Sequence, residues 1–167
     1  MKDLQKLFRL VKPYWKLAVI SLVLLTALVF MDLSIPRLIE RIIDDGIKQK
    51  SMSVVLQTSA LMLGISALST LFAIGNNIYS IRVGEGVARD LREAIFEKIQ
   101  SFSYGNIDHF TTGRLMIRLS SDALAVQRVF QISLRIGTRA PLLMIGSLIL
   151  MFNTSRELAL TIVPLML

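Results

Sequence analysis

The side chain that most suggests chemistry in this sequence is an aspartate surrounded by apolar residues. Asp32 is the one charged residue of the stretch 17–35. A carboxylate is costly in an apolar setting, so an acid kept there is a functional candidate. The alternative is a water-filled outer vestibule near Arg37, which would solvate the carboxylate without giving it a role. The sequence favours neither interpretation over the other.

Amide and guanidinium groups form two further sets of candidates. Asn76 and Asn77 lie deep in the uncharged stretch 52–81, where they either bind a neighbouring helix or line a cavity. One polar side of a helix is predicted by four residues spaced three or four apart: Arg128, Gln131, Arg135 and Arg139. Their long side chains either extend to lipid head groups and acidic neighbours, or form the basic wall of a cavity that attracts anionic amphiphiles.

Several other kinds of chemistry are excluded by what the sequence lacks. It contains no cysteine, so it has neither a disulfide nor a thiolate metal site. Its one histidine, His109, cannot form a metal cluster alone, and an exposed position in a turn explains it. No G-x-x-x-x-G-K-[ST] motif and no ATP-hydrolysing residue occurs. We therefore expect no catalytic residue, metal site or cofactor site in this chain.

The polar candidates are set among segments long enough to cross a membrane. The 167 residues are 53% hydrophobic, with a mean hydropathy of +0.61. About 18 apolar residues suffice for a spanning helix. Spans are predicted at about 16–43, 53–102 and 113–155, and a fourth begins at 157–167. Because that fourth run is too short to cross a bilayer, we interpret the chain as a fragment of a longer protein. The alternative is a complete short protein with a re-entrant tail.

Charge is unevenly distributed over the segments that flank the spans. Five basic residues and one acid precede the first span, and residues 82–139 carry nine basic and six acidic residues. The segment 32–51 carries four of each. Because basic segments stay on the cytoplasmic side, we expect a multi-pass protein of the cytoplasmic membrane with its N-terminus inside. Anionic lipid explains the net charge of +7. No nucleic-acid partner is expected, because the basic residues do not alternate with aromatic ones.

This orientation assigns a depth to each polar candidate. Asp32 falls in the outer part of the first span, whereas the arginines fall on the inner half of the third. The candidates for a translocation pathway are Asp32, Asn76, Asn77, Arg135 and Arg139. Residues 1–15 are predicted to form an amphipathic helix that lies on the inner membrane surface.

Two of the predicted helices are longer than a bilayer is thick. An apolar stripe continues the second helix to about residue 102, so 53–102 would measure roughly 75 Å. The hydrocarbon core is about 30 Å thick. A returning helix begins near Gly113. The two helices therefore project into the cytoplasm as antiparallel arms, joined by the tip, residues 103–112.

Charges spaced four residues apart are expected to stabilise these arms. Arg89 can pair with Glu85 or Glu93 on the outgoing arm, and Arg118 can pair with Asp122 on the returning arm. Three residues are predicted to brace the returning arm behind the tip: Arg114, Arg118 and Asp122.

Four short motifs resemble the transmembrane domain of the ABC exporters, the family of lipid flippases and multidrug half-transporters. "DLREAIFEKI" (90–99) resembles the inner end of that family's second helix, and "DHFTTGRLMIRLSSD" (108–122) resembles its D-x-x-x-T-G-x-L-x-x-R-L-x-x-D segment. "LVKPYWK" (10–16) and "PRLIERIIDDGI" (36–47) resemble the stretch before the first span and the first outer loop. The resemblance covers essentially the whole chain, as about the first half of such a domain.

The resemblance implies an all-α membrane protein, the N-terminal part of an exporter's transmembrane domain over 16–167. It also implies that the tip couples to a nucleotide-binding domain. The coupling residues would be Tyr104, Asn106, Ile107, Asp108, His109, Phe110, Thr111 and Thr112. The complete transporter would use ATP and Mg²⁺, would pair with a second half-transporter, and would export amphiphiles such as drugs or lipids. The alternative function is a membrane sensor or scaffold whose helical arms bind a signalling partner.

Overall fold

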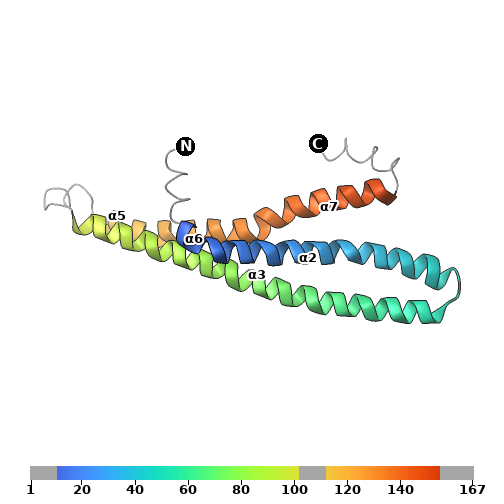
Figure 1. Cartoon of the computed structure of the whole chain (residues 1–167). Coiled ribbons are helices and arrows are strands. Elements are labelled where there is room, and N and C mark those ends of the chain that lie inside the picture. Colours follow the sequence, from blue (N-terminus) through green and yellow to red (C-terminus); the bar gives the residue numbers. More distant parts are fainter. Residues whose placement is uncertain (1–10, 102–111, 155–167) are drawn as a thin grey trace. The chain divides into compact units, whose positions relative to one another are not determined.

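The computed structural model describes residues 11–101 and 112–154. Every regular element in these two ranges is helical, so the all-α class is confirmed (Figure 1). The predicted surface helix over 1–15 is described only from residue 11, and the fourth apolar run, from residue 157, lies outside the described ranges.

The first long helix begins at a proline. Pro13 lies in a single 3₁₀ turn, Lys12–Tyr14, because its fixed φ suits a first turn and its missing N–H has no partner to lose there. Helix α2 follows over Trp15–Arg41 and passes through Pro36. It widens into a π turn at Ile42–Ile47.

A tight connection turns the chain back into the second helix. The backbone N–H of Ser51 donates to the carbonyl of Gly46 at 2.8 Å, and Lys50 has a φ of 55°, in the left-handed region. A Cβ on Gly46 would lie 2.6 Å from Cγ2 of Val55, so only glycine allows the chain to approach this closely. Helix α3 then runs unbroken over Met52–Gln100, as an apolar stretch without proline predicts.

The returning segment contains three helices separated by π turns. They are α5 (Thr112–Ile117), α6 (Ala123–Ile132) and α7 (Thr138–Thr154). The π turns cover Arg118–Asp122 and Ser133–Gly137. A π turn bonds residue i to i+5 and so changes which residues share a face.

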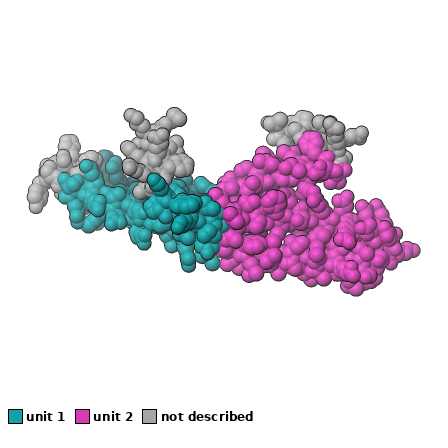
Figure 2. All heavy atoms as spheres, viewed as in Figure 1, with its two compact units in different colours: residues 1–21, 77–135 teal, residues 22–76, 136–167 magenta. Residues whose placement is uncertain are grey.

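The chain divides into two compact units, coloured separately in Figure 2. One consists of 1–21 and 77–135, and its fully buried residues include Val83, Val87 and Ala123. The other consists of 22–76 and 136–167, and is centred on Leu25, which is 1% exposed.

Three helical stretches of the described chain are long and apolar enough to cross a membrane: Lys12–Ile47, Met52–Gln100 and Gly113–Thr154. Little of these stretches is buried in the structure: of the most apolar 18 residues of Met52–Gln100, only 6% are buried. Lipid or further helices must cover the remainder, because apolar side chains are unfavourable in water.

Candidate functional site

An ion pair joins the first and third membrane helices. Nη2 of Arg139, on α7, donates a hydrogen bond to Oδ2 of Asp32, on α2, at 2.8 Å. The two side chains are 46% and 32% exposed. Two candidates that the sequence presented separately are therefore one group with no net charge. The acid is neutralised by Arg139 rather than by Arg37.

This contact brings together two charges that the sequence placed at different depths. The sequence placed Asp32 in the outer part of the membrane and Arg139 in the inner half. Their bonded atoms lie 2.8 Å apart, so the carboxylate and the guanidinium share one depth. The long side chain of an arginine can reach along its helix to an acid, because an unpaired guanidinium is costly among apolar residues.

A glycine brings α2 and α7 together beside the ion pair. A Cβ on Gly146 would overlap Cδ1 of Leu33, the residue next to Asp32. Gly146 and Arg139 are seven residues apart and thus lie on the same face of α7. Leu33 and Gly146 also line a groove of about 180 Å³, whose seven lining residues are Phe30, Leu33, Ser34, Arg37, Gly146, Ile149 and Leu150.

The two asparagines have different surroundings. Asn76 is 4% exposed, so it faces protein rather than an open cavity. Asn77 is partly exposed, and its Oδ1 is buried with no hydrogen-bond partner among the described residues. A buried unpaired carbonyl is costly. Asn77 is therefore the better candidate for contacting a group from elsewhere in the protein or a passing ligand.

The predicted basic stripe does not form one uniform wall. Gln131 lies against Gly84 of α3, where a Cβ would be 2.6 Å from its Cγ, and Arg139 is neutralised by Asp32. Arg135 lies within the π turn Ser133–Gly137, is exposed, and forms no ion pair within the described ranges. Arg135 is thus the member best able to attract an anionic molecule.

A second polar cluster, which sequence reasoning missed, joins the start of α2 to α3. The hydroxyl of Tyr14 donates to Oδ1 of Asp90 at 3.0 Å and accepts from Nη2 of Arg89 at 2.9 Å. The ring of Tyr14 lies on Gly86, where a Cβ would be 2.5 Å from Cε1 and Cζ. Nε of Arg89 also lies 3.6 Å from Oδ1 of Asp90. The available signal was the pair of closely spaced glycines, Gly84 and Gly86, which leave room for a neighbouring side chain on α3.

The expected pairs of Arg89 with Glu85 or Glu93 are not formed in the described structure. Helical i,i+4 pairs at a surface contribute only about 0.2–0.5 kcal/mol. The tyrosine hydroxyl and the adjacent aspartate offer Arg89 two partners at once, so the tertiary contact prevails over the local one.

The returning arm is packed by apolar rather than charged residues. Arg114, Arg118 and Asp122 are exposed, and within the described ranges Arg118 and Asp122 form no ion pair. The predicted pairing was wrong: both side chains are exposed, and an exposed pair of this kind contributes too little free energy to hold two side chains together. Leu115 and Ala123, 9% and 0% exposed, hold the arm instead.

The predicted coupling residues from Tyr104 to Thr111 lie outside the described residues, and α5 begins at Thr112.

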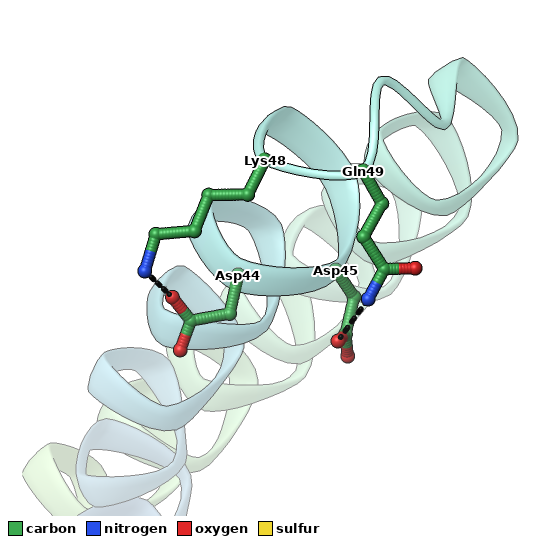
Figure 3. A network of polar contacts seen from close by, with 4 residues as sticks. All are labelled: Asp44, Asp45, Lys48 and Gln49. Atoms are coloured by element: carbon green, nitrogen blue, oxygen red, sulfur yellow. Dashed lines mark hydrogen bonds and ion pairs between the residues drawn. The ribbon is translucent and has the colours of Figure 1, made fainter.

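At the other end of α3, two side-chain contacts stabilise the π turn that precedes the connection (Figure 3). Nζ of Lys48 lies 2.7 Å from Oδ1 of Asp44, and Nε2 of Gln49 lies 3.4 Å from Oδ1 of Asp45. The hydrogen bond to Asp44 raises the pKa of Lys48, so this lysine keeps its charge to a higher pH than an ordinary lysine.

Comparison with known proteins identifies the family. Residues 18–167 match the model of the ABC transporter transmembrane region. The chain belongs to this family. The match covers Asp32, Arg139 and all of α3, and it includes three of the four motifs, so the resemblance to this family is confirmed. The family assignment also argues against a sensor or scaffold.

Three relatives show the breadth of the similarity. The chain is 36% identical over 147 residues to the uncharacterized ABC transporter ATP-binding protein YfiB of Bacillus subtilis, covering 88% of this chain and 26% of the relative. It is 30% identical over 151 residues to the protein MT1311 of Mycobacterium tuberculosis, with 90% and 26% covered. It is 26% identical over 166 residues to a multidrug resistance ABC transporter ATP-binding and permease protein of Lactococcus lactis, with 98% and 27% covered. The chain thus spans about a quarter of these relatives.

Proposed function

We propose that this ABC transporter region is the membrane-spanning part of an ATP-driven exporter of amphiphilic molecules, with residues 104–112 coupling it to a nucleotide-binding domain. The length of α3 carries the proposal. Its 49 residues correspond to about 74 Å of helix, against a bilayer core of about 30 Å. A helix of this length can transmit the movement of a domain outside the membrane to the helices inside it.

Charge and family membership support the remaining parts of the proposal. The basic excess before α2 and over 82–139 favours a cytoplasmic position for the N-terminus and for the 104–112 segment. One relative is named a multidrug resistance transporter with an ATP-binding part, which supports amphiphilic substrates. ATP and Mg²⁺ would act on the nucleotide-binding domain of the complete protein, because this sequence contains no phosphate-binding motif. A second half-transporter would complete the pathway.

Cysteine crosslinking tests the coupling. This chain has no cysteine, so a single one can be placed at Ile107 or Phe110 in a protein whose other cysteines have been replaced. We expect a crosslink to the nucleotide-binding domain that weakens when the ATP sites are disabled, because the contact moves with that domain. Lys50→Cys, in the connection before α3, is the control and should not crosslink. Absence of a crosslink in every nucleotide state would refute the coupling.

A second test addresses the pathway. Arg135→Gln is expected to lower ATPase activity stimulated by an anionic amphiphile about two- to fivefold, and to lower basal activity less, because an exposed charge contributes about 0.2–1 kcal/mol. The control is Arg41→Gln, which removes an exposed charge from the end of α2, outside the basic stripe. Equal losses of stimulated and basal activity, or equal effects of both variants, would contradict the cavity role.

A further inference from the structure

The groove between α2 and α7 has an apolar body and a single cationic group. Of the seven lining residues, Phe30, Leu33, Ile149 and Leu150 are apolar, and Gly146 leaves space because it has no side chain. Ser34 donates its hydroxyl hydrogen to the carbonyl of Phe30 at 2.8 Å, so that donor is already used. The guanidinium of Arg37 is the remaining polar donor of the groove.

Arg37 has donors available for a ligand. It is exposed and forms no ion pair with any carboxylate in the described part of the chain. Two acids near it have other partners: Asp44 contacts Lys48 at 2.7 Å and Asp45 contacts Gln49 at 3.4 Å. The third, Glu40, does not line the groove; with Arg41, Asp44 and Asp45 it lines a separate cavity that Arg37 also borders.

The acid nearest the groove is also neutralised. Asp32 does not line the groove but is next in sequence to Leu33, which does, and the carboxylate of Asp32 is bound to Arg139. An anion in the groove would therefore meet one free cation and no free carboxylate from the wall. Five hydrogen-bond donors in a planar fork make a guanidinium well suited to a phosphate group.

We propose that this groove binds an anionic membrane phospholipid, with an acyl chain along Leu33, Ile149 and Leu150 and the phosphate on Arg37. The position of Arg37 supports this occupant. The most apolar part of the first span ends near it, and polar residues of the connection follow, so the cation lies where head groups lie. The proposal does not depend on the direction or substrate of transport, because the lipid would be a bound component of the fold.

Photolabelling in a bilayer tests the proposal. The complete protein is reconstituted in phosphatidylcholine vesicles with photoreactive phosphatidylglycerol, which carries a diazirine in one acyl chain. We expect labelling of residues 30–37 and 146–150. Arg37→Ala should reduce it about five- to tenfold, because it removes charge-assisted hydrogen bonds. Photoreactive diacylglycerol has no phosphate for Arg37 to bind. Its labelling of the wild-type groove should therefore be as weak as the labelling of the Arg37→Ala variant by phosphatidylglycerol.

Two further variants separate groove binding from general attraction. Arg41→Ala removes a neighbouring cation that does not line the groove, and should leave the labelling unchanged. Ser34→Leu fills the groove, and should reduce labelling by both lipids. Equal labelling by the two lipids, an equal loss in Arg37→Ala and Arg41→Ala, or no labelling of the wild-type groove because other helices cover it would each overturn the proposal.

Discussion

Substituting Asp32 with alanine is expected to destabilise the protein by about 1–3 kcal/mol, because it leaves the Arg139 guanidinium unpaired between membrane helices. The pair is partly exposed, at 32% and 46%, so the cost should stay below the values measured for fully buried pairs. The measurement is the midpoint of thermal unfolding of the purified complete protein in detergent.

A double-mutant cycle isolates the contribution of the pair itself. Arg139→Ala should also destabilise, and the double alanine variant should lose less than the sum of the two single losses. The charge swap, with Arg at 32 and Asp at 139, should recover part of the wild-type stability, whereas Arg37→Ala should not couple to Asp32. Additive losses at 32 and 139 would show that the 2.8 Å contact contributes no coupling free energy.

The second large effect is expected at Gly86. A leucine there would place side-chain atoms where the ring of Tyr14 lies, since even a Cβ would come within 2.5 Å of Cε1 and Cζ. Displacing the ring also breaks the hydrogen bonds of its hydroxyl with Asp90 and Arg89. We expect a loss of about 2–4 kcal/mol in the free energy of unfolding, seen as a lower unfolding midpoint.

A second glycine of α3 provides the matched control. Apart from its neighbours in the chain and the backbone of its own helix turn, no atom lies within 4 Å of the Cβ position of Gly64. Gly64→Leu should therefore be tolerated, and helix propensity should favour it. The combination of Tyr14→Ala with Gly86→Leu should recover part of the loss, because the ring is absent. If Gly64→Leu destabilises the protein as much as Gly86→Leu, the loss comes from replacing a glycine of the helix and not from displacing the ring of Tyr14.

The sequence predicted the helices well because their signals are local. Uncharged stretches and apolar periodicity depend on neighbouring residues only, and α3 over Met52–Gln100 corresponds to the helix expected at 53–102. The π turns at Arg118–Asp122 and Ser133–Gly137 were not predicted, because a single extra residue per turn leaves no pattern in composition. The spacing of Arg118 and Asp122 indicated an ion pair that is absent, because an exposed pair contributes too little free energy to fix two side chains.

Partner choice was the part of the candidate site that local patterns could not decide. Asp32 and Arg139 were each identified as unusual charges, but they are 107 residues apart, and no periodicity connects them. Tyr14 binds Arg89 and Asp90 of α3, 75 and 76 residues away, and no local pattern indicated this contact. Arg37 was considered only as a neighbour of Asp32, and its place in the groove wall depends on α7.

The amino-acid sequence by itself therefore determined the helical class, the three membrane-spanning lengths and the membership in the ABC transporter family, because these depend on local hydropathy and on motifs of adjacent residues. Only the tertiary structure decided which charges neutralise each other, which glycines admit a neighbouring side chain, and where a groove remains. Those outcomes depend on how helices distant in sequence approach each other, and an approach at Gly86 or Gly146 is set by the residues of both helices together.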